Sequence, residues 1–398
     1  MNQPRLAAAM LVAAACVRGQ TFTQRGFLDV TTLTYPQSAP SDSGHFVSEA
    51  LLRYEAFYKL TPKFQFNGGV DFRTDTHREV ARDLDFSWAD RQTPRPAVAV
   101  RRFSATYSSG PLTIEAGKQF IRWGKADILN PTDRFAPQDF LNVVQTDFLG
   151  VTGARVTVGG QSNTLELVWV PLFTPSRTPL ITQRWVVLPQ GIPFTDGGAR
   201  YPGGSQFGAR WNHTGAAEYS LSFYDGRNHL PLYEPSLQLR RFHPQMRMYG
   251  GDLAVPLSKL TIKGEAGYFT STTRQADEYL LYVIQLERQQ GEWSFTGGYA
   301  GEVVTERRNI LNFAPDRGLS RAFLGRAGYT LDANRSLAIQ TAIRQNGHGV
   351  WGKFEYSQAF GQHWRATAGV ALIAGKDTDF LGQYHRNSHF LFSMRYSF

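Results

Sequence analysis

The chain has 398 residues, a formal net charge of +9, 13% aromatic residues and 38 glycines, a composition that favours strands over helices. Its mean hydropathy of −0.33 predicts no transmembrane helix beyond the N-terminal run described next. Because the Lys and Arg residues are dispersed along the chain, the basic excess does not predict binding to nucleic acid.

Residues 1–19 have the pattern of a secretory signal peptide. Arg5 precedes an apolar run from Leu6 to Val17, and small residues follow. The alternatives are a buried N-terminal helix and a lipidation site at Cys16. Cys16 is the single cysteine, so cleavage after Gly19 would leave a mature chain with no cysteine and no reliance on disulfides. We therefore expect an exported protein whose residues 20–398 form one domain.

From residue 26 onward, segments of about ten residues alternate apolar with polar or small side chains, which is the period of a strand. In residues 45–60, "HFVSEALLRYEAFYKL", Phe46, Leu52 and Tyr54 share one face, while Glu49 and Arg53 share the other. The same alternation recurs in "KFQFNGGVDFR", "LTIKGEAGYFT", "RATAGVALIAG" and "NSHFLFSMRYSF". The pattern predicts about eighteen strands, within a range of roughly 16–18.

The connections between these segments alternate in length. Short ones such as "TPK", "HTGA" and "GQH" are rich in turn formers, and long ones lie at 74–96, 125–150, 174–205, 225–245 and 306–321. Aromatic residues flank the short turns, for example Trp211 and Tyr219 around "HTGA". Rings collected at one rim are typical of a membrane-interface girdle, whereas the core of a soluble β-sandwich would not concentrate them there.

The closing strand "FLFSMRYSF", with its alternating aromatics and terminal Phe398, resembles the C-terminal assembly signal of Gram-negative outer-membrane β-barrels. A second stretch resembles a poorly characterised porin-like family with W-G-x-x-D…N-P-x-D and W-x-P-x-F-x-P. Its residues are Trp123, Gly124, Asp127, Asn130, Pro131, Asp133, Trp169, Pro171, Phe173 and Pro175. The resemblance implies an all-β, transmembrane up-and-down antiparallel barrel in a bacterial outer membrane, with short periplasmic turns and long extracellular loops.

The sequence offers little for metal or catalytic chemistry. His385 and His389 are four residues apart, but near a junction between a loop and a strand that spacing is not helical. Asp127, Asp133 and Asp139 could offer oxygen ligands to calcium, yet no calcium loop of the D-x-D-x-D-G type is present. A barrel hydrolase would need Ser and His in contact, and no G-x-S-x-G motif occurs. We predict no catalytic residue, no metal and no cofactor.

The predicted lumen carries both acids and bases. An excess of fixed positive charge would favour anions, whereas acids and bases that pair across strands would only stiffen the wall, and both interpretations stay open. The predicted pore-lining residues are Glu49, Arg53, Glu55, Arg73, Glu115, Arg155, Arg210, Lys263, Glu265, Arg326, Arg344, Lys353 and Arg365.

Residues 125–150 are the leading candidate for a constriction loop, because they are polar, stiffened by proline and long enough to enter the barrel. The charged residues of this candidate loop are Lys125, Asp127, Asp133, Arg134 and Asp139, and we expect its aspartates to face lumen water. The 174–205 loop is a second candidate.

We interpret the chain as a passive channel for small hydrophilic solutes, anions among them. The alternatives are a barrel component of an export or surface-binding system and a barrel hydrolase. The expected partners are outer-membrane lipid, the barrel-assembly machinery and small solutes, with a homo-oligomer as a further possibility and no nucleic acid.

Overall fold

A computed structural model describes residues 21–398 except 85, 128, 189–191, 235 and 309–313. The predicted signal peptide and Cys16 therefore lie outside the described residues. None of the helical segments in the described ranges is long and apolar enough to cross a bilayer.

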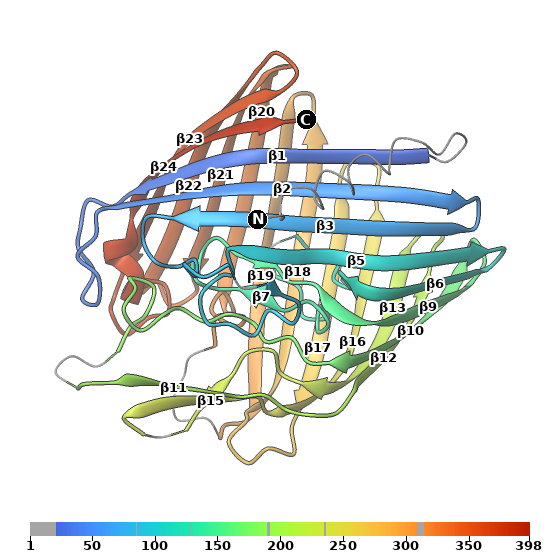
Figure 1. Ribbon diagram of the computed structural model, residues 1–398, viewed down its shortest axis with the longest axis horizontal. Helices are drawn as coiled ribbons and strands as arrows, with labels where there is room; N and C mark the ends of the chain where they lie inside the picture. The colour runs from blue at the N-terminus through green and yellow to red at the C-terminus, as the bar shows by residue number, and fades with distance from the viewer. Residues whose placement is uncertain (1–20, 85, 128, 189–191, 235, 309–313) are drawn as a thin grey trace, which may run out of the picture.

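Eighteen antiparallel strands within the described residues form one closed barrel, which confirms the predicted fold class (Figure 1). Each strand pairs with the next along the chain, and β1 also pairs with β24, from Phe27 opposite Ser397 to Thr34 opposite Phe390. The strands are β1 (Thr21–Thr34), β2 (Phe46–Thr61), β3 (Phe64–Asp75), β5 (Val98–Ser109), β6 (Leu112–Gln119), β9 (Val151–Gly159), β10 (Asn163–Leu172), β12 (Gln206–His213), β13 (Glu218–Arg227), β16 (Gln245–Pro256), β17 (Thr261–Thr270), β18 (Glu278–Gln290), β19 (Trp293–Glu306), β20 (Ala322–Asp332), β21 (Arg335–Arg344), β22 (Gly349–Phe360), β23 (Trp364–Gly375) and β24 (His389–Ser397).

The terminal residue completes the seam of the barrel. The backbone N–H of Phe398 donates to the carbonyl of Gly26 at 3.0 Å, and the N–H of Gly26 donates to the carbonyl of Phe398 at 2.9 Å. A Cβ at residue 26 would lie only 2.6 Å from the Phe398 ring, so this close approach requires glycine. The seam leaves no unpaired edge at the position where the first and last strands meet.

The remaining elements lie in the long connections. β4 (Phe86–Ser87) pairs in parallel with the first two residues of β5, Val98 and Ala99. β7 (Gln138–Asp139) pairs with β8 (Asp147–Phe148), and β11 (Thr195–Arg200), β14 (Leu232–Tyr233) and β15 (Gln238–Phe242) form a small separate sheet. A short 3-10 helix, η1 (Gly382–Asn387), precedes β24.

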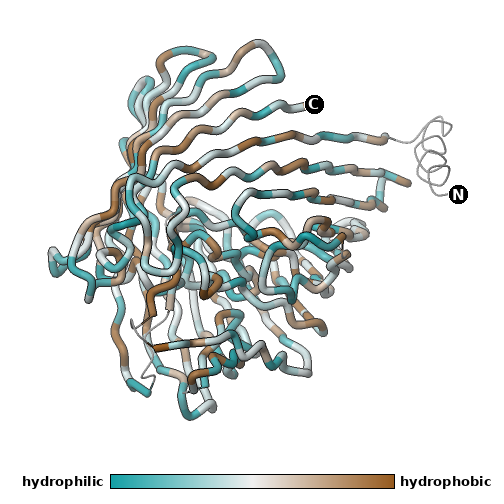
Figure 2. The backbone as a smooth tube through the Cα atoms, turned by 60° about the vertical axis from the view of Figure 1, so that its left-hand side comes forward, coloured by the Kyte–Doolittle hydropathy of each residue, from teal (hydrophilic) through white to brown (hydrophobic). Residues whose placement is uncertain are grey.

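The outer face of the barrel is apolar. Figure 2 shows hydrophobic and hydrophilic residues alternating along the strands, and the hydrophobic set includes exposed Leu221, Phe323 and Leu372. Beside the short turns the predicted girdle forms, with Trp211 against Tyr219 and Trp293 against Tyr329 at ring distances of 5.6 and 4.6 Å. An exposed apolar band bordered by aromatic rings is the surface that a bilayer covers.

Candidate functional site

Residues 120–150, here called the inner segment, connect β6 to β9 and pack inside the barrel. Ile121, Trp123 and Phe135 belong to a buried apolar cluster. Their partners are inward-facing side chains of the wall from β9 to β18: Val151, Val168, Val170, Tyr224, Met246, Met248, Phe269, Tyr279 and Leu281. This part of the lumen is therefore filled with packed side chains rather than water.

The turn at the start of the inner segment is held by the residues of the first sequence motif. Asp133 Oδ1 accepts hydrogen bonds from the backbone N–H groups of Trp123 at 2.5 Å and Gly124 at 2.7 Å. Asp133 Oδ2 also accepts one from Arg122 Nε at 3.0 Å, and Asn130 Nδ2 donates to the carbonyl of Ala126. In this chain the motif therefore satisfies backbone groups that the turn would otherwise leave unpaired.

The wall strand β17 anchors this turn through one carboxylate. Glu265 Oε2 accepts from the backbone N–H groups of Lys125 at 2.9 Å and Ala126 at 3.1 Å. Its Oε1 accepts from both the N–H and the hydroxyl of Thr132 at 2.8 Å. Next to it, Lys263 Nζ lies 3.2 Å from Asp127 Oδ2. Four hydrogen bonds to one buried carboxylate fix the position of the turn against the wall.

The far end of the inner segment is held by ion pairs to the opposite wall. Asp147 Oδ2 lies 3.1 Å from Arg53 of β2, 3.7 Å from Arg73 of β3 and 2.9 Å from Arg101 of β5. The neighbouring Asp71 lies 2.7 Å from Arg53 and 3.1 Å from Arg73. The inner segment thus spans the lumen from β17 to β2, β3 and β5.

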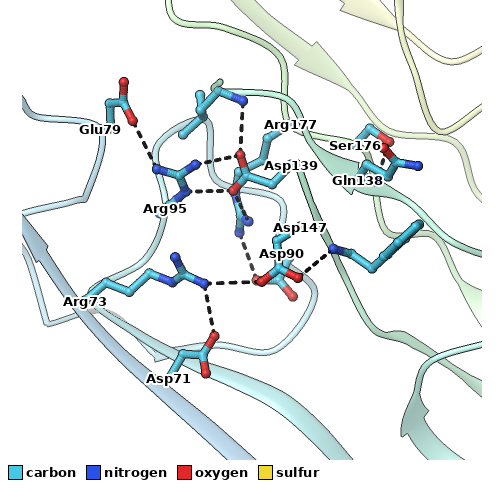
Figure 3. Close-up of polar contacts among 12 residues, drawn as sticks. Asp71, Arg73, Glu79, Asp90, Arg95, Gln138, Asp139, Asp147, Ser176 and Arg177 are labelled. Carbon is cyan, nitrogen blue, oxygen red and sulfur yellow. Dashed lines mark hydrogen bonds and ion pairs between the residues drawn. The ribbon is translucent and has the colours of Figure 1, made fainter. Parts of the chain in front are cut away.

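A second group of ion pairs continues from this point (Figure 3). Asp139 Oδ2 lies 2.9 Å from Arg95 Nε and 3.2 Å from Arg177 Nη1. Arg95 also contacts Glu49 and Glu79, each at 3.0 Å. Burial would raise the pKa of Asp139, but the two guanidinium groups outweigh it and hold that pKa well below its usual range.

Asp90 extends this group of ion pairs, because it lies 2.9 Å from Arg177 and 2.5 Å from Lys118. The residues form one connected network of six cations and six carboxylates, which are Arg53, Arg73, Arg95, Arg101, Lys118, Arg177, Asp71, Asp90, Asp139, Asp147, Glu49 and Glu79. Its formal charges cancel when all carboxylates are ionised.

Two cavities flank the inner segment. The first has a volume of about 600 Å³ and extends from Thr261 and Ser294, near the short turns, to Leu319 and Leu381 in the long loops. The second has a volume of about 450 Å³ and lies against β1–β3 and β22–β24, below Trp185 of the 173–194 loop. Thr146 lines both cavities, so residues around it stand between them.

The two cavities differ in how their charges are paired. Arg288 and Arg326 line the first cavity and have no hydrogen-bond or ion-pair partner among the described residues, but Arg288 shares the outward parity of the exposed Ile284 and Leu286, so the unpaired charge that faces the lumen is Arg326. The acids of this cavity, Asp127, Glu287 and Asp316, lie 3.2, 2.5 and 3.6 Å from cations. In the second cavity every lining charge is paired: Arg53, Arg73, Arg95 and Arg395 with Asp29, Glu49, Glu79 and Asp147, and Glu355 with Lys353.

Burial raises the pKa of Glu79 to about 7, despite the attraction of Arg95. Because Glu79 lines the second cavity, the formal charge of that cavity changes near neutral pH.

The predicted pore-lining residues all have inward strand parity, but the structure gives them different surroundings. Glu49, Arg53 and Arg73 line the second cavity and Arg326 the first. Others lie on inward positions outside both cavities, in contact with the inner segment, with each other or with neighbouring groups: Glu55, Glu115, Arg155, Arg210, Lys263, Glu265, Arg344, Lys353 and Arg365.

The predicted residues of the candidate constriction loop also differ in their exposure to the lumen. The expectation that its aspartates face water fits Asp127, whose side chain is 54% exposed, but not Asp133 or Asp139, which are 6% and 4% exposed. Lys125 pairs with Glu218 at 2.9 Å, and Arg134 lies 3.6 Å from Asp316. Asp133 and Asp139 are buried because they accept hydrogen bonds from the backbone and from arginines.

Sequence reasoning missed several charged residues of the network, above all Arg95, Asp147 and Arg177. All three stand in long connections, where strand alternation does not reveal the direction of a side chain.

The second motif, W-x-P-x-F-x-P from Trp169 to Pro175, begins in β10 of the wall and continues into the connection that follows. Trp169 is 46% exposed on the outer face, whereas Phe173 is buried and packs on His229 and His243 at ring distances of 5.3 and 4.7 Å. His229 Nδ1 lies 2.5 Å from the carbonyl of Thr174, so this histidine joins the connection after β13 to the connection after β10. Across the described residues, no three His, Cys, Asp or Glu side chains are grouped to hold a metal.

No protein-family model matches the chain, and no curated protein matches it. Solved structures do. A BenF-like porin from Pseudomonas fluorescens has 9% sequence identity and a TM-score of 0.57, with 96% of this chain and 98% of that chain covered. OccAB4 of Acinetobacter baumannii has 11% identity and a TM-score of 0.56, with 96% and 99% covered. OpdQ of Pseudomonas aeruginosa has 11% identity and a TM-score of 0.51, with the same coverage. At such identities the similarity establishes the fold, that of a porin-like barrel.

Proposed function

We propose that the protein is an outer-membrane channel for the passive diffusion of small hydrophilic solutes. The observation that carries the proposal is a closed eighteen-stranded barrel in the described residues, apolar outside, with cavities of about 600 and 450 Å³ along its polar inner wall. In a bilayer such a closed wall satisfies the strand hydrogen bonds and encloses an aqueous path. The porin structures that share the fold add support by analogy.

The proposal includes a preference for anions. Its support is the first cavity, where the inward-facing Arg326 is free of carboxylate partners among the described residues while the acids are paired. Fixed positive charge in a narrow aqueous path concentrates anions and repels cations. The alternative of a wall stiffened by mutual pairing describes the second cavity better.

We also propose that residues 125–150 constrict the pore. The support is the attachment of this segment to opposite walls of the barrel, through Glu265 of β17 at one end and through Arg53 and Arg101, which hold Asp147, at the other. The second candidate loop, 174–205, contributes Trp185 above the second cavity. Deleting 126–146 is expected to raise single-channel conductance, and an unchanged conductance in a folded variant would contradict the constriction.

Planar-bilayer recording of the purified protein tests the channel. We expect stepwise conductance and, in a gradient of KCl, a reversal potential that reports chloride selectivity. A barrel that refolds, as judged by heat-modifiable mobility on gels, and stays silent would refute the channel and favour a component of an export or surface-binding system. A cation-selective reversal potential would refute only the anion preference.

The remaining parts of the proposal concern targeting and assembly. Residues 1–19 would be removed on export, and the closing strand that ends at Phe398 would be recognised by the barrel-assembly machinery. Mass spectrometry of protein extracted from outer membranes checks the first point, and a Phe398→Ala variant that fails to reach the membrane checks the second. Cross-linking in membranes would reveal whether the barrels associate as homo-oligomers.

A further inference from the structure

A pocket of about 420 Å³ lies outside the lumen, between the small sheet of β11, β14 and β15 and the end of the barrel wall. Figure 1 shows this sheet projecting from the end of the barrel where the long loops gather. Arg200 and Arg227 line the pocket together with Thr273 and Gln275, and its single carboxylate is Glu234. The pocket is separate from both cavities described above.

The pocket carries unpaired hydrogen-bond donors. Among the described residues, neither the Arg200 nor the Arg227 guanidinium has a hydrogen-bond or ion-pair partner, and the Gln275 amide has none either. Thr273 Oγ1 accepts from the backbone N–H of Gln245 at 3.0 Å, which leaves its own hydroxyl hydrogen free to donate. Two guanidinium groups with a hydroxyl and an amide form a donor set for a tetrahedral oxyanion.

Strand parity places Arg227 of this donor set at the end of the lipid-facing wall. Along β13, Leu221 and Phe223 face outward, and Phe223 packs on the 52% exposed Tyr249. Two residues further, Asp225 pairs with Arg247 at 2.9 Å, and two residues beyond that the strand ends at Arg227. Successive outward residues thus change from apolar to charged, as expected where hydrocarbon gives way to lipid headgroups.

One wall of the pocket is aromatic. The rings of Tyr201 and His243 stack with a centroid distance of 5.9 Å and an interplanar angle of 21°, and both line the pocket. Arg91 lies 5.1 Å from the Tyr201 ring, and Phe173 supports His243 at 4.7 Å, so the stack is held in place from other loops. A fixed aromatic wall beside oxyanion donors suits a ring that carries a charged group, and the volume exceeds that of a bare phosphate.

We propose that this pocket binds the phosphorylated sugar headgroup of a glycolipid in the outer leaflet. The two guanidinium groups, Thr273 and Gln275 would hold the phosphate, and the stack of Tyr201 and His243 would contact the sugar ring. The acyl chains would lie along the apolar outer faces of β13 and β16. The proposal rests on the outer-membrane location in the proposed function, but not on the solute or on conduction.

The test uses the full barrel in detergent micelles, titrated with lipid A, a phosphorylated glucosamine disaccharide lipid, and examined by native mass spectrometry. We expect a one-to-one complex with the wild type. Its affinity for lipid A should fall about tenfold or more in the double variant Arg200→Ala/Arg227→Ala, because losing one hydrogen bond to a charged group already weakens binding by about tenfold. Arg240→Ala is the matched control, because Arg240 is an exposed arginine of the same sheet that does not line the pocket.

Equal lipid A affinity in the wild type, the double variant and the control would overturn the proposal. Binding of soluble glucose 1-phosphate without binding of lipid A would overturn the lipid assignment and indicate a capture site for free solutes. Single-channel conductance of the double variant is expected to equal that of the wild type, because the pocket lies outside the lumen. A silent wild-type barrel that still binds lipid A would refute the channel and leave this site standing.

Discussion

The two ends of the inner segment are fixed by different kinds of interaction. At the first end, Trp123 and Phe135 are buried in an apolar cluster, and Glu265 accepts hydrogen bonds from the backbone. At the second end, Asp139 and Asp147 are held by arginines, and Asp147 lines the second cavity. Apolar packing is insensitive to salt, whereas ion pairs near water are weakened by it. The packing at the first end is therefore insensitive to salt. At the second end, ionic strength can weaken the ion pairs of the half-exposed Asp147, whereas those of the buried Asp139 are largely protected.

Removing a large side chain from the first end should produce the largest loss of stability. Phe135 is 1% exposed and packs edge-on against Trp123 and Tyr224 at ring distances of 5.2 and 4.9 Å. Phe135→Ala is expected to lower the free energy of unfolding by about 3–5 kcal/mol, the usual cost of such a cavity. Denaturant unfolding in micelles, followed by tryptophan fluorescence, measures it.

The matched change at the outer wall is Phe323→Ala, which removes a ring that is 54% exposed. We expect it to cost clearly less, because lipid or detergent fills the vacated space. Equal losses for the two variants would mean that the inner segment is not packed as part of the core.

At the second end, the largest effect should be on ion selectivity. Asp147→Asn removes the carboxylate shared by Arg53, Arg73 and Arg101, and leaves those arginines in charge excess. One unit charge about 8 Å away in water corresponds to about 0.5 kcal/mol, or roughly twofold in local ion concentration. We therefore expect the chloride-to-potassium permeability ratio to rise roughly twofold at low salt and less at high salt.

Reversal potentials in KCl gradients give this ratio. Asp225→Asn is the control, because Asp225 pairs with Arg247 on the outer face of the barrel and not in the lumen. A ratio that stays constant in Asp147→Asn, or that shifts equally in both variants, would show that the second end does not face the conducting path.

A smaller and opposite change is expected in the first cavity. Arg326 lies between Thr296 and Gln340 on neighbouring strands and has no acidic partner among the described residues. Arg326→Gln should lower the chloride-to-potassium ratio by up to about twofold, because it removes one fixed positive charge from this cavity. Lys259→Gln makes the same charge change in an exposed short turn and should leave the ratio unchanged. Reversal potentials in KCl gradients measure the ratio for both variants. Identical ratios in Arg326→Gln and Lys259→Gln would show that the first cavity does not belong to the conducting path.

Strand alternation made the wall predictable from sequence, but not the interior. The inward position of Glu49 and Arg53 follows from a period of two, which local residues determine. The role of Asp139 depends on Arg95 and Arg177, which are 44 and 38 residues away in the chain, in other loops. The residues next to an aspartate in the sequence do not reveal whether it is exposed to water or buried against arginines that are distant in the chain. The buried role of Asp133 in supporting backbone groups therefore became evident only from the fold.

The smallest expected effect, a dependence on pH, tests whether the second cavity conducts at all. Burial raises the pKa of Glu79 to about 7, above its ordinary value, so the group is neutral well below pH 7 and ionised well above it. As pH rises from about 6 to 8, that cavity gains one negative charge, and the chloride-to-potassium ratio should fall modestly.

The raised pKa also means that the contribution of Glu79 to the stability of the fold is complete below pH 4.5 and is lost as pH rises through about 7. Glu79→Gln should remove the pH dependence of the ratio, whereas Glu292→Gln, in a short turn, should retain it. If the wild-type ratio is flat across this range while Asp147→Asn still shifts it, protonation of Glu79 is not sensed by the permeating ions.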